Sequence, residues 1–143
     1  MASPPDIRDI ACDGYAFDMS VRVELAELQH QLNNFGSTPY LVTTSADLRP
    51  HTTHVIVSLD GGHLNAIVGR KTATNITDRA LVSLLFMPVE PGGFSLIVDG
   101  IGSVRTTDDV HAVSINVTAA VLHRNADPDG GYRADCAPLD GRS

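Results

Sequence analysis

The chain lacks tryptophan and carries a single lysine among its 143 residues. Its 10 basic residues face 17 acidic ones, which gives a formal net charge of −7 at pH 7. Because nucleic-acid binding needs a surface rich in lysine and arginine, this balance argues against a nucleic-acid partner. The lysine, Lys71, directly follows Arg70, and no other two Lys or Arg residues are adjacent. This pair is therefore a local cationic spot in an acidic chain, large enough for a small anion.

Long apolar runs are absent as well. No run reaches the roughly 18 to 20 residues that a membrane-spanning helix needs. The N-terminus has no basic segment followed by an apolar one, as a secretory signal would. We therefore expect a cytoplasmic protein without a membrane segment. In a reducing compartment, free thiols at Cys12 and Cys136 are favoured over a disulfide between them, which stays the alternative.

Zinc-like spacing of histidine and cysteine is also missing. His51 and His54 lie three positions apart in a segment rich in β-branched residues. On a strand these positions point to opposite faces, so the two imidazoles cannot easily share an ion. We predict no metal site.

The length fits one domain, residues 1–143, and we expect loose arms at about 1–19 and 125–143. Apolar residues recur at helical spacing at Leu25, Leu28, Leu32 and Phe35. This spacing predicts an amphipathic helix over about 21–36, with Ser20 as its N-cap.

From Pro39 onward the sequence is typical of strands. Asp60-Gly61-Gly62 predicts a tight hairpin turn, residues 69–79 a short helix, and Gly100 and Gly102 a bend or bulge in a long strand. The nearly continuous apolar run at 80–88 predicts a strand covered on both faces. The six expected strands cover residues 39–45, 51–59, 63–68, 80–88, 94–107 and 110–124. We predict a mainly β, six-stranded barrel with one N-terminal helix and a short helix after the third strand.

The end of the third strand carries the clearest chemistry. Gly69 lets a ligand approach the backbone, and the first turn of the following helix offers unpaired N–H groups. Arg70 grips phosphate oxygens in a forked geometry, and Lys71 adds a point charge. This predicts a phosphate site. The alternative is that the two cations are solvated and that Thr72 caps the helix.

The ordered set of segments resembles the pyridoxamine 5′-phosphate oxidase-like family of FMN-binding split β-barrels, especially its small actinobacterial flavin and deazaflavin members. The resemblance is carried by residues 38–64, 68–86, 90–104 and 118–124. It implies a split β-barrel and a homodimer with the cofactor in the groove between subunits. The partner would contribute contacts from residues 86–94.

The resemblance also implies site residues. Polar contacts to the isoalloxazine ring would come from the strand beginning at His51, and the ribityl and phosphate end would lie where the third strand meets the short helix. The implied residues are Thr52, Thr53, His54, Val68, Gly69, Arg70, Lys71, Thr72 and, behind them in the helix, Asn75. Many family members have a lysine where this chain has Thr72, so its cations come one and two residues earlier.

The resemblance therefore implies an FMN-binding oxidoreductase acting on an unidentified small molecule. The alternatives are an F420-dependent reductase of the same fold and a non-catalytic barrel that binds flavin or has lost its cofactor. No catalytic acid or base is named, because in flavin enzymes the cofactor carries the hydride chemistry. The roles of His123 and Arg124 stay open.

Overall fold

A computed structural model of the protein describes residues 20–125. The expected arms at 1–19 and 126–143, with Cys12 and Cys136, lie outside the described residues. Within residues 20–125, no helix is long and apolar enough to cross a membrane.

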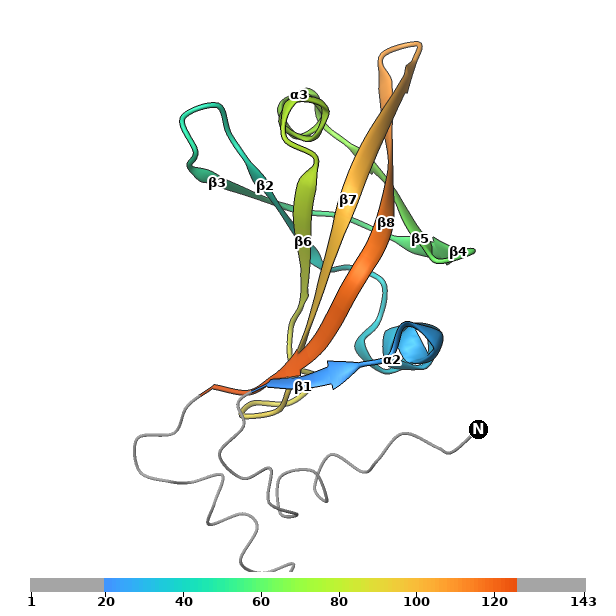
Figure 1. Cartoon of the computed structure of the whole chain (residues 1–143), viewed down its shortest axis with the longest axis vertical. Coiled ribbons are helices and arrows are strands. Elements are labelled where there is room, and N and C mark those ends of the chain that lie inside the picture. Colours follow the sequence, from blue (N-terminus) through green and yellow to red (C-terminus); the bar gives the residue numbers. More distant parts are fainter. Residues whose placement is uncertain (1–19, 126–143) are drawn as a thin grey trace, which may run out of the picture.

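The chain folds into one strongly coiled antiparallel sheet of eight strands (Figure 1). Its order is β3-β2-β6-β7-β8-β5-β4, and β1 pairs with β8. The strands are β1 (Ser20–Val23), β2 (Tyr40–Thr44), β3 (Pro50–His54), β4 (Ser58–Asp60), β5 (His63–Val68), β6 (Leu81–Phe86), β7 (Ser95–Thr107) and β8 (Val110–His123). The helical elements are the 3₁₀ turn η1 (Leu25–Glu27), α2 (Leu28–Phe35) and α3 (Arg70–Asp78). This architecture confirms the predicted mainly β barrel, with α2 and α3 toward opposite ends.

Alternation along the strands builds a single core. In β6 the side chains of Val82, Leu84 and Phe86 are buried, and the residues between them face outward. Leu28 and Leu32 of α2 join the same core. The predicted helical leucine stripe is therefore confirmed at these two positions, whereas Leu25 is 47% exposed.

The N-terminal boundary of the predicted helix is wrong. Residues 20–23 form β1, whose Ser20 pairs with His123 of β8, and the α-helix begins only at Leu28. Val21 and Val23 are β-branched and suit a strand. The edge of β8 gives them a partner far away in the sequence, which local periodicity does not reveal.

The predicted strand over 51–59 is divided into β3 and β4. The connecting segment 55–57 instead bonds to the chain before β2, with Val55 N–H donating to Pro39 O and Val57 N–H to Ser37 O. Val55 and Val57 still point inward and are buried, so the apolar alternation was predicted correctly although the ladder is interrupted. This division and β1 account for eight strands instead of six.

Two glycine predictions are confirmed. Gly61 and Gly62 make the turn between β4 and β5 with φ of 58° and 83°. The register of β7 and β8 shifts between Asp99 and Gly100, where an added Cβ would meet Ile115 Cγ2 at 2.5 Å. The strand bulges where only a glycine fits.

The expectation that both faces of the strand at 80–88 are covered is wrong for the single protomer. Leu81 is 74% exposed, and Ser83 and Leu85 on the same face are only partly buried. The outward side chains of this strand are nearly as apolar as the inward ones, so composition did not distinguish the two faces.

Candidate functional site

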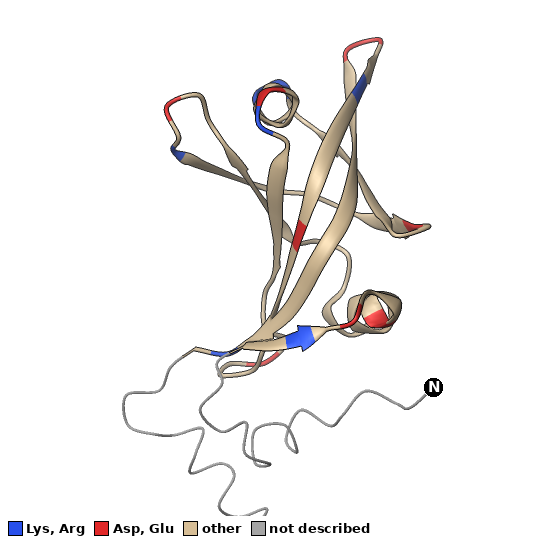
Figure 2. Cartoon of the chain, viewed as in Figure 1, with Lys and Arg blue, Asp and Glu red and all other residues tan. Residues whose placement is uncertain are grey.

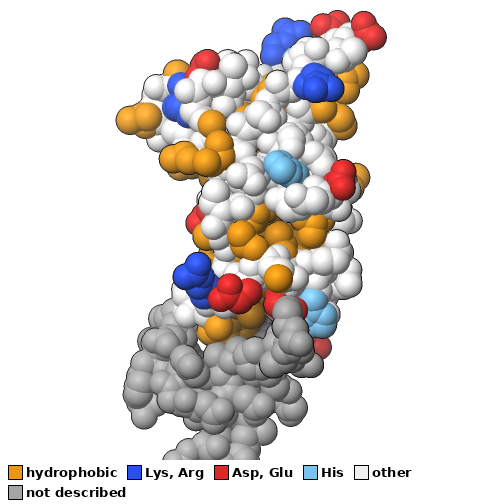
Figure 3. All heavy atoms as spheres, turned by 45° about the vertical axis from the view of Figure 1, so that its right-hand side comes forward, with side chains coloured by type: hydrophobic (Ala, Val, Ile, Leu, Met, Phe, Trp, Pro, Cys, Tyr) orange, Lys and Arg blue, Asp and Glu red, His pale blue; other side chains and the backbone are white. Residues whose placement is uncertain are grey.

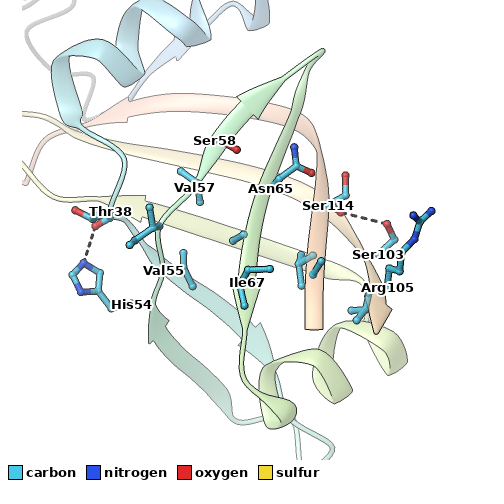
Figure 4. Close-up of a pocket in the computed structure, with 15 residues that line it drawn as sticks. Thr38, His54, Val55, Val57, Ser58, Asn65, Ile67, Ser103, Arg105 and Ser114 are labelled. Atoms are coloured by element: carbon cyan, nitrogen blue, oxygen red, sulfur yellow. Dashed lines mark hydrogen bonds between the residues drawn. The ribbon is translucent and has the colours of Figure 1, made fainter. Parts of the chain in front are cut away.

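A groove of about 1190 Å³ runs between the 54–58 segment and β5 and continues across β8 to β7 (Figure 4). Its apolar lining comes from residues such as Val55, Ile56 and Ile67, and Ile56 and Ile67 are 73% and 63% exposed. The described residues that line it are Thr38, His54, Val55, Ile56, Val57, Ser58, Asn65, Ala66, Ile67, Ser103, Val104, Arg105, Ala112, Val113 and Ser114. None of them is acidic.

The view in Figure 3 shows hydrophobic side chains gathered in patches between charged ends of the molecule. Figure 2 shows basic residues on α3 and near the outer end of β7, and few charges along the middle of the sheet. An apolar groove with few polar groups is the usual form of a small-molecule site.

His54 is held firmly at the rim of the groove. Its Nε2 lies 2.8 Å from the carbonyl oxygen of Thr38, and its ring stacks on Tyr40 with centroids 4.7 Å apart. Because a carbonyl oxygen only accepts, Nε2 carries the hydrogen in this bond. The Nδ1 atom is left without a partner among the described residues, and in the neutral imidazole it is an acceptor.

Of the predicted ring-side residues, only His54 lines the groove. Thr52 is exposed on β3, and Thr53 lies on the opposite face, which it shares with Val55. The Thr53 hydroxyl oxygen is buried and has no hydrogen-bond partner among the described residues. A buried hydroxyl without a partner is costly, which makes Thr53 a candidate contact for a bound polar group.

The predicted phosphate end lies where β5 passes into α3. Gly69 is the N-cap, and none of the described side chains caps the helix there. The first helical bond runs from Ala73 N–H to Gly69 O at 3.0 Å. The N–H groups of Arg70, Lys71 and Thr72 therefore have no partner within the helix.

Gly69 has no evident packing reason to be glycine. Its φ is −80°, which any residue adopts. A Cβ added there would meet nothing within 4 Å. An open approach to the backbone of the first helical turn is the remaining use for this glycine.

The side chains of Arg70 and Lys71 are exposed, and neither lines the large groove. Arg70 lines a smaller hollow of about 180 Å³ between α3 and the β7–β8 hairpin, together with Thr106 and His111. Val104 lines both cavities. Thr106 and His111 of the hollow pair on the sheet face opposite to Arg105 and Ala112 of the groove, so the two cavities lie on opposite sides of the hairpin.

The structure places two further predicted residues underneath α3. Thr72 and Asn75 are 2% and 4% exposed. The Asn75 amide donates to the Thr43 hydroxyl at 3.1 Å and to the Ser45 hydroxyl at 3.5 Å. These contacts fasten the helix to β2 and the turn that follows it.

The sequence analysis did not name most of the groove. It missed the segment 56–58, the middle of β5 and Arg105. Segment 56–58 and the middle of β5 come together because the chain leaves the β3 ladder before β4 begins. No local sequence pattern predicts that break. Because side chains alternate along the long strand 94–107, the sequence could have predicted that Arg105 lies on the outer face. It could not have predicted that Arg105 lies in the same groove as residues of β5.

The fold and the groove define a split β-barrel with an open cleft. No family model matches the chain. An uncharacterized protein of Mycobacterium tuberculosis is 32% identical over 121 residues, covering 76% of this chain and 84% of that protein.

Solved structures share the fold at low identity. A candidate pyridoxamine 5′-phosphate oxidase of Listeria innocua aligns with a TM-score of 0.58 at 15% identity, over 69% of this chain and 98% of its own. An FAD-binding protein of Mesorhizobium loti aligns with a TM-score of 0.59 at 11% identity, over 76% of this chain and 98% of its own. An F420 reductase aligns with a TM-score of 0.51 at 16% identity, over 59% of this chain and 88% of its own. The chain therefore belongs to one family with the mycobacterial protein, and it has the split-barrel fold of pyridoxamine 5′-phosphate oxidase-like structures.

This fold also serves another ligand. The haem storage protein HutZ of Vibrio cholerae aligns with a TM-score of 0.56 at 12% identity, over 71% of this chain and 96% of its own. Proteins with this fold therefore include flavin- and F420-associated proteins as well as a haem storage protein.

Proposed function

We propose that the protein binds a flavin-type cofactor, FMN in the first place, and acts as an oxidoreductase on a small molecule. The observation that carries this proposal is the groove between residues 54–58 and β5, whose described lining is free of carboxylates and includes Ile67, two residues before Gly69 at the uncapped start of α3. An apolar cleft suits a planar ring system, and an uncapped helix start suits a phosphate.

The residues present fit such a cofactor. Val55, Ile56 and Ile67 offer apolar contact to a ring. The N–H groups at the start of α3, with the side chains of Arg70 and Lys71, would hold the phosphate. When bound, the flavin supplies hydride transfer, and the protein binds and orients it.

A homodimer is part of the proposal. On the outer face of the sheet, Leu81 pairs with Ile101, and Leu85 pairs with Ile97. Leu81 and Ile101 are 74% and 46% exposed. An exposed apolar sheet face of this kind marks an interaction site. The same face of β7 continues from Ile101 through Ser103 to Arg105, so a second subunit on it would lie beside the groove.

A binding titration tests the cofactor proposal. FMN should bind the wild type with a change in flavin fluorescence. The Arg70→Ala/Lys71→Ala double variant should lose about 2 to 4 kcal/mol of binding free energy, because charge-assisted contacts contribute about 1.5 to 3 each and need not add. Arg22→Ala, an exposed arginine on β1, is the control. An unchanged affinity in the double variant would remove these side chains from the phosphate site.

A non-catalytic binding role is the second candidate. Among the described residues that line the groove, His54 is the one side chain suited to proton transfer near neutral pH. Similarity to a haem storage protein points the same way. Oxidation of pre-reduced FMN or F420 by an added acceptor, faster with protein than without it, would establish an enzyme. Binding without such turnover would establish the storage role.

A further inference from the structure

Arg105 stands at the β7 end of the groove, away from the residues that sequence reasoning connected with phosphate (Figure 4). Strand register places Ile67 opposite Ala112, and Ala112 opposite Arg105. The three side chains therefore share one face of the sheet. Since neighbouring strands lie about 4.8 Å apart, Arg105 is roughly 10 Å across the sheet from Ile67.

The Arg105 guanidinium has no hydrogen bond or ion pair with another described residue. The adjacent row on the same face is polar and uncharged, and consists of Asn65, Ser114 and Ser103. An unpaired guanidinium beside hydroxyl and amide groups, in a groove whose described lining has no carboxylate, has the chemistry of an anion site.

Charges of both signs lie near this end. Val104, next to Arg105, also lines the hollow that contains Arg70, and Asp78 lines the same hollow. The nearby acids are Asp78, which lies 4.0 Å from Arg79, and the hairpin-tip residues Asp108 and Asp109. The hairpin tip repels anions, so an anionic group would lie on the groove side of Arg105.

We propose that Arg105 binds an anionic group, a phosphate or a carboxylate, of the ligand in this groove. The identity of that ligand rests on the proposed function, which makes it a flavin-type cofactor. Arg105 then supplies from β7 a cation separate from those at the start of α3.

A matched pair of ligands isolates the anionic group. Riboflavin and FMN differ by one phosphate, so each is titrated into wild type, Arg105→Ala and the control Arg22→Ala. Arg105→Ala should weaken FMN binding about tenfold or more and leave riboflavin affinity within about twofold. The proposal would be overturned if Arg105→Ala weakened FMN and riboflavin binding equally. It would also be overturned if the variant weakened binding of neither FMN nor the longer cofactors FAD and F420.

Longer cofactors distinguish which anionic group is bound. If the Arg105→Ala loss appears with FAD or F420 but not with FMN, Arg105 binds a group beyond the first phosphate. If FMN shows the loss in full, Arg105 binds that phosphate itself. Arg105→Lys separates the forked geometry from the charge, since lysine restores only the charge.

A cofactor-independent measurement separates this inference from the proposed function. Inorganic pyrophosphate is titrated into labelled full-length protein while the Arg Nε–Hε NMR signals are followed. The Arg105 signal should shift saturably, and the Arg22 signal should not. If the wild type binds neither FMN nor F420 but Arg105 responds, the proposed function fails and the anion site stands. No response of Arg105, together with no selective loss for any phosphate-bearing ligand, refutes the site.

Discussion

At the scale of single residues, glycines of this chain show which positions are set by packing. A Cβ on Gly102 would meet Ile76 Cγ2 at 2.8 Å, whereas a Cβ on Gly69 would meet nothing within 4 Å. Gly102 is therefore explained by the approach of α3 to β7. For Gly69 we propose that the reason is access to the first turn of α3, so the two positions should respond differently to the same methyl group.

Gly69→Ala should change the free energy of unfolding by no more than about 1 kcal/mol, since glycine is only a moderately better N-cap than alanine. It should still weaken FMN binding, because the methyl group narrows the approach to the helix start. Gly102→Ala should destabilise by about 1 to 3 kcal/mol through overpacking. Urea unfolding and FMN titration measure both. Equal destabilisation, or full FMN affinity in Gly69→Ala, would contradict this view of Gly69.

Residue chemistry explains why the site was only partly predicted. Arg70, Lys71 and Gly69 were predicted as phosphate contacts because cations and a glycine at a strand end are visible locally, and that role stays a prediction. Thr72 and Asn75 follow the same motif, but the helical turn carries them underneath α3 into the core. Phe86 and Phe94 are also buried, whereas Tyr40 is 39% exposed and stacks on His54.

At the scale of elements, α3 depends on a buried polar contact for its position. Asn75 projects from the middle of the helix and bonds Thr43 of β2, and Arg79 at the helix end donates from Nε to Thr44 O at 2.8 Å. Both contacts join α3 to the same strand. They therefore set where the uncapped helix start lies relative to the groove.

Asn75→Ala should lower the free energy of unfolding by about 1 to 3 kcal/mol, because it removes a buried amide and leaves the Thr43 hydroxyl without that donor. Thr74→Ala, at the adjacent and exposed position of the same helix, is the control and should cost less than about 0.5 kcal/mol. Urea denaturation followed by circular dichroism gives both values. Similar values for the two variants would show that the buried bond contributes little.

The elements also show which parts of the fold local sequence patterns predict. Hairpin 58–68 and helix α3 were predicted nearly to the residue, since Gly61-Gly62 and the strand-to-helix change are local signals. The division of β3 from β4 and the pairing of β1 with β8 were not, since both depend on partners distant in sequence. The groove arises at that division, so its lining was missed for the same reason.

At the scale of the whole molecule, the outer sheet face is the surface on which we propose that a second subunit packs. Its centre is the Ser83–Asp99 hydrogen bond of 2.6 Å, flanked by the apolar pairs of β6 and β7. Through this bond the Asp99 carboxylate has a hydrogen-bond donor although the residues on either side of it are apolar. A second subunit on this face would extend toward the groove through the outer residues of β7.

Leu81→Lys should convert a dimer into monomers, because it buries a charge in the proposed interface. The fold itself should stay intact, since Leu81 is 74% exposed in the protomer. Leu48→Lys, at a 75% exposed leucine in the β2–β3 turn, should leave the dimer unchanged. Sedimentation velocity gives the mass. A monomeric wild type, or a dimeric Leu81→Lys, would place the interface elsewhere or exclude it.

A crystal structure of the protein grown with FMN tests the central claim most directly. The account predicts the ring against residues 54–57 and β5, and the phosphate at the start of α3. Density for the ring on any other surface, or clear density for an empty groove at saturating FMN, would contradict it.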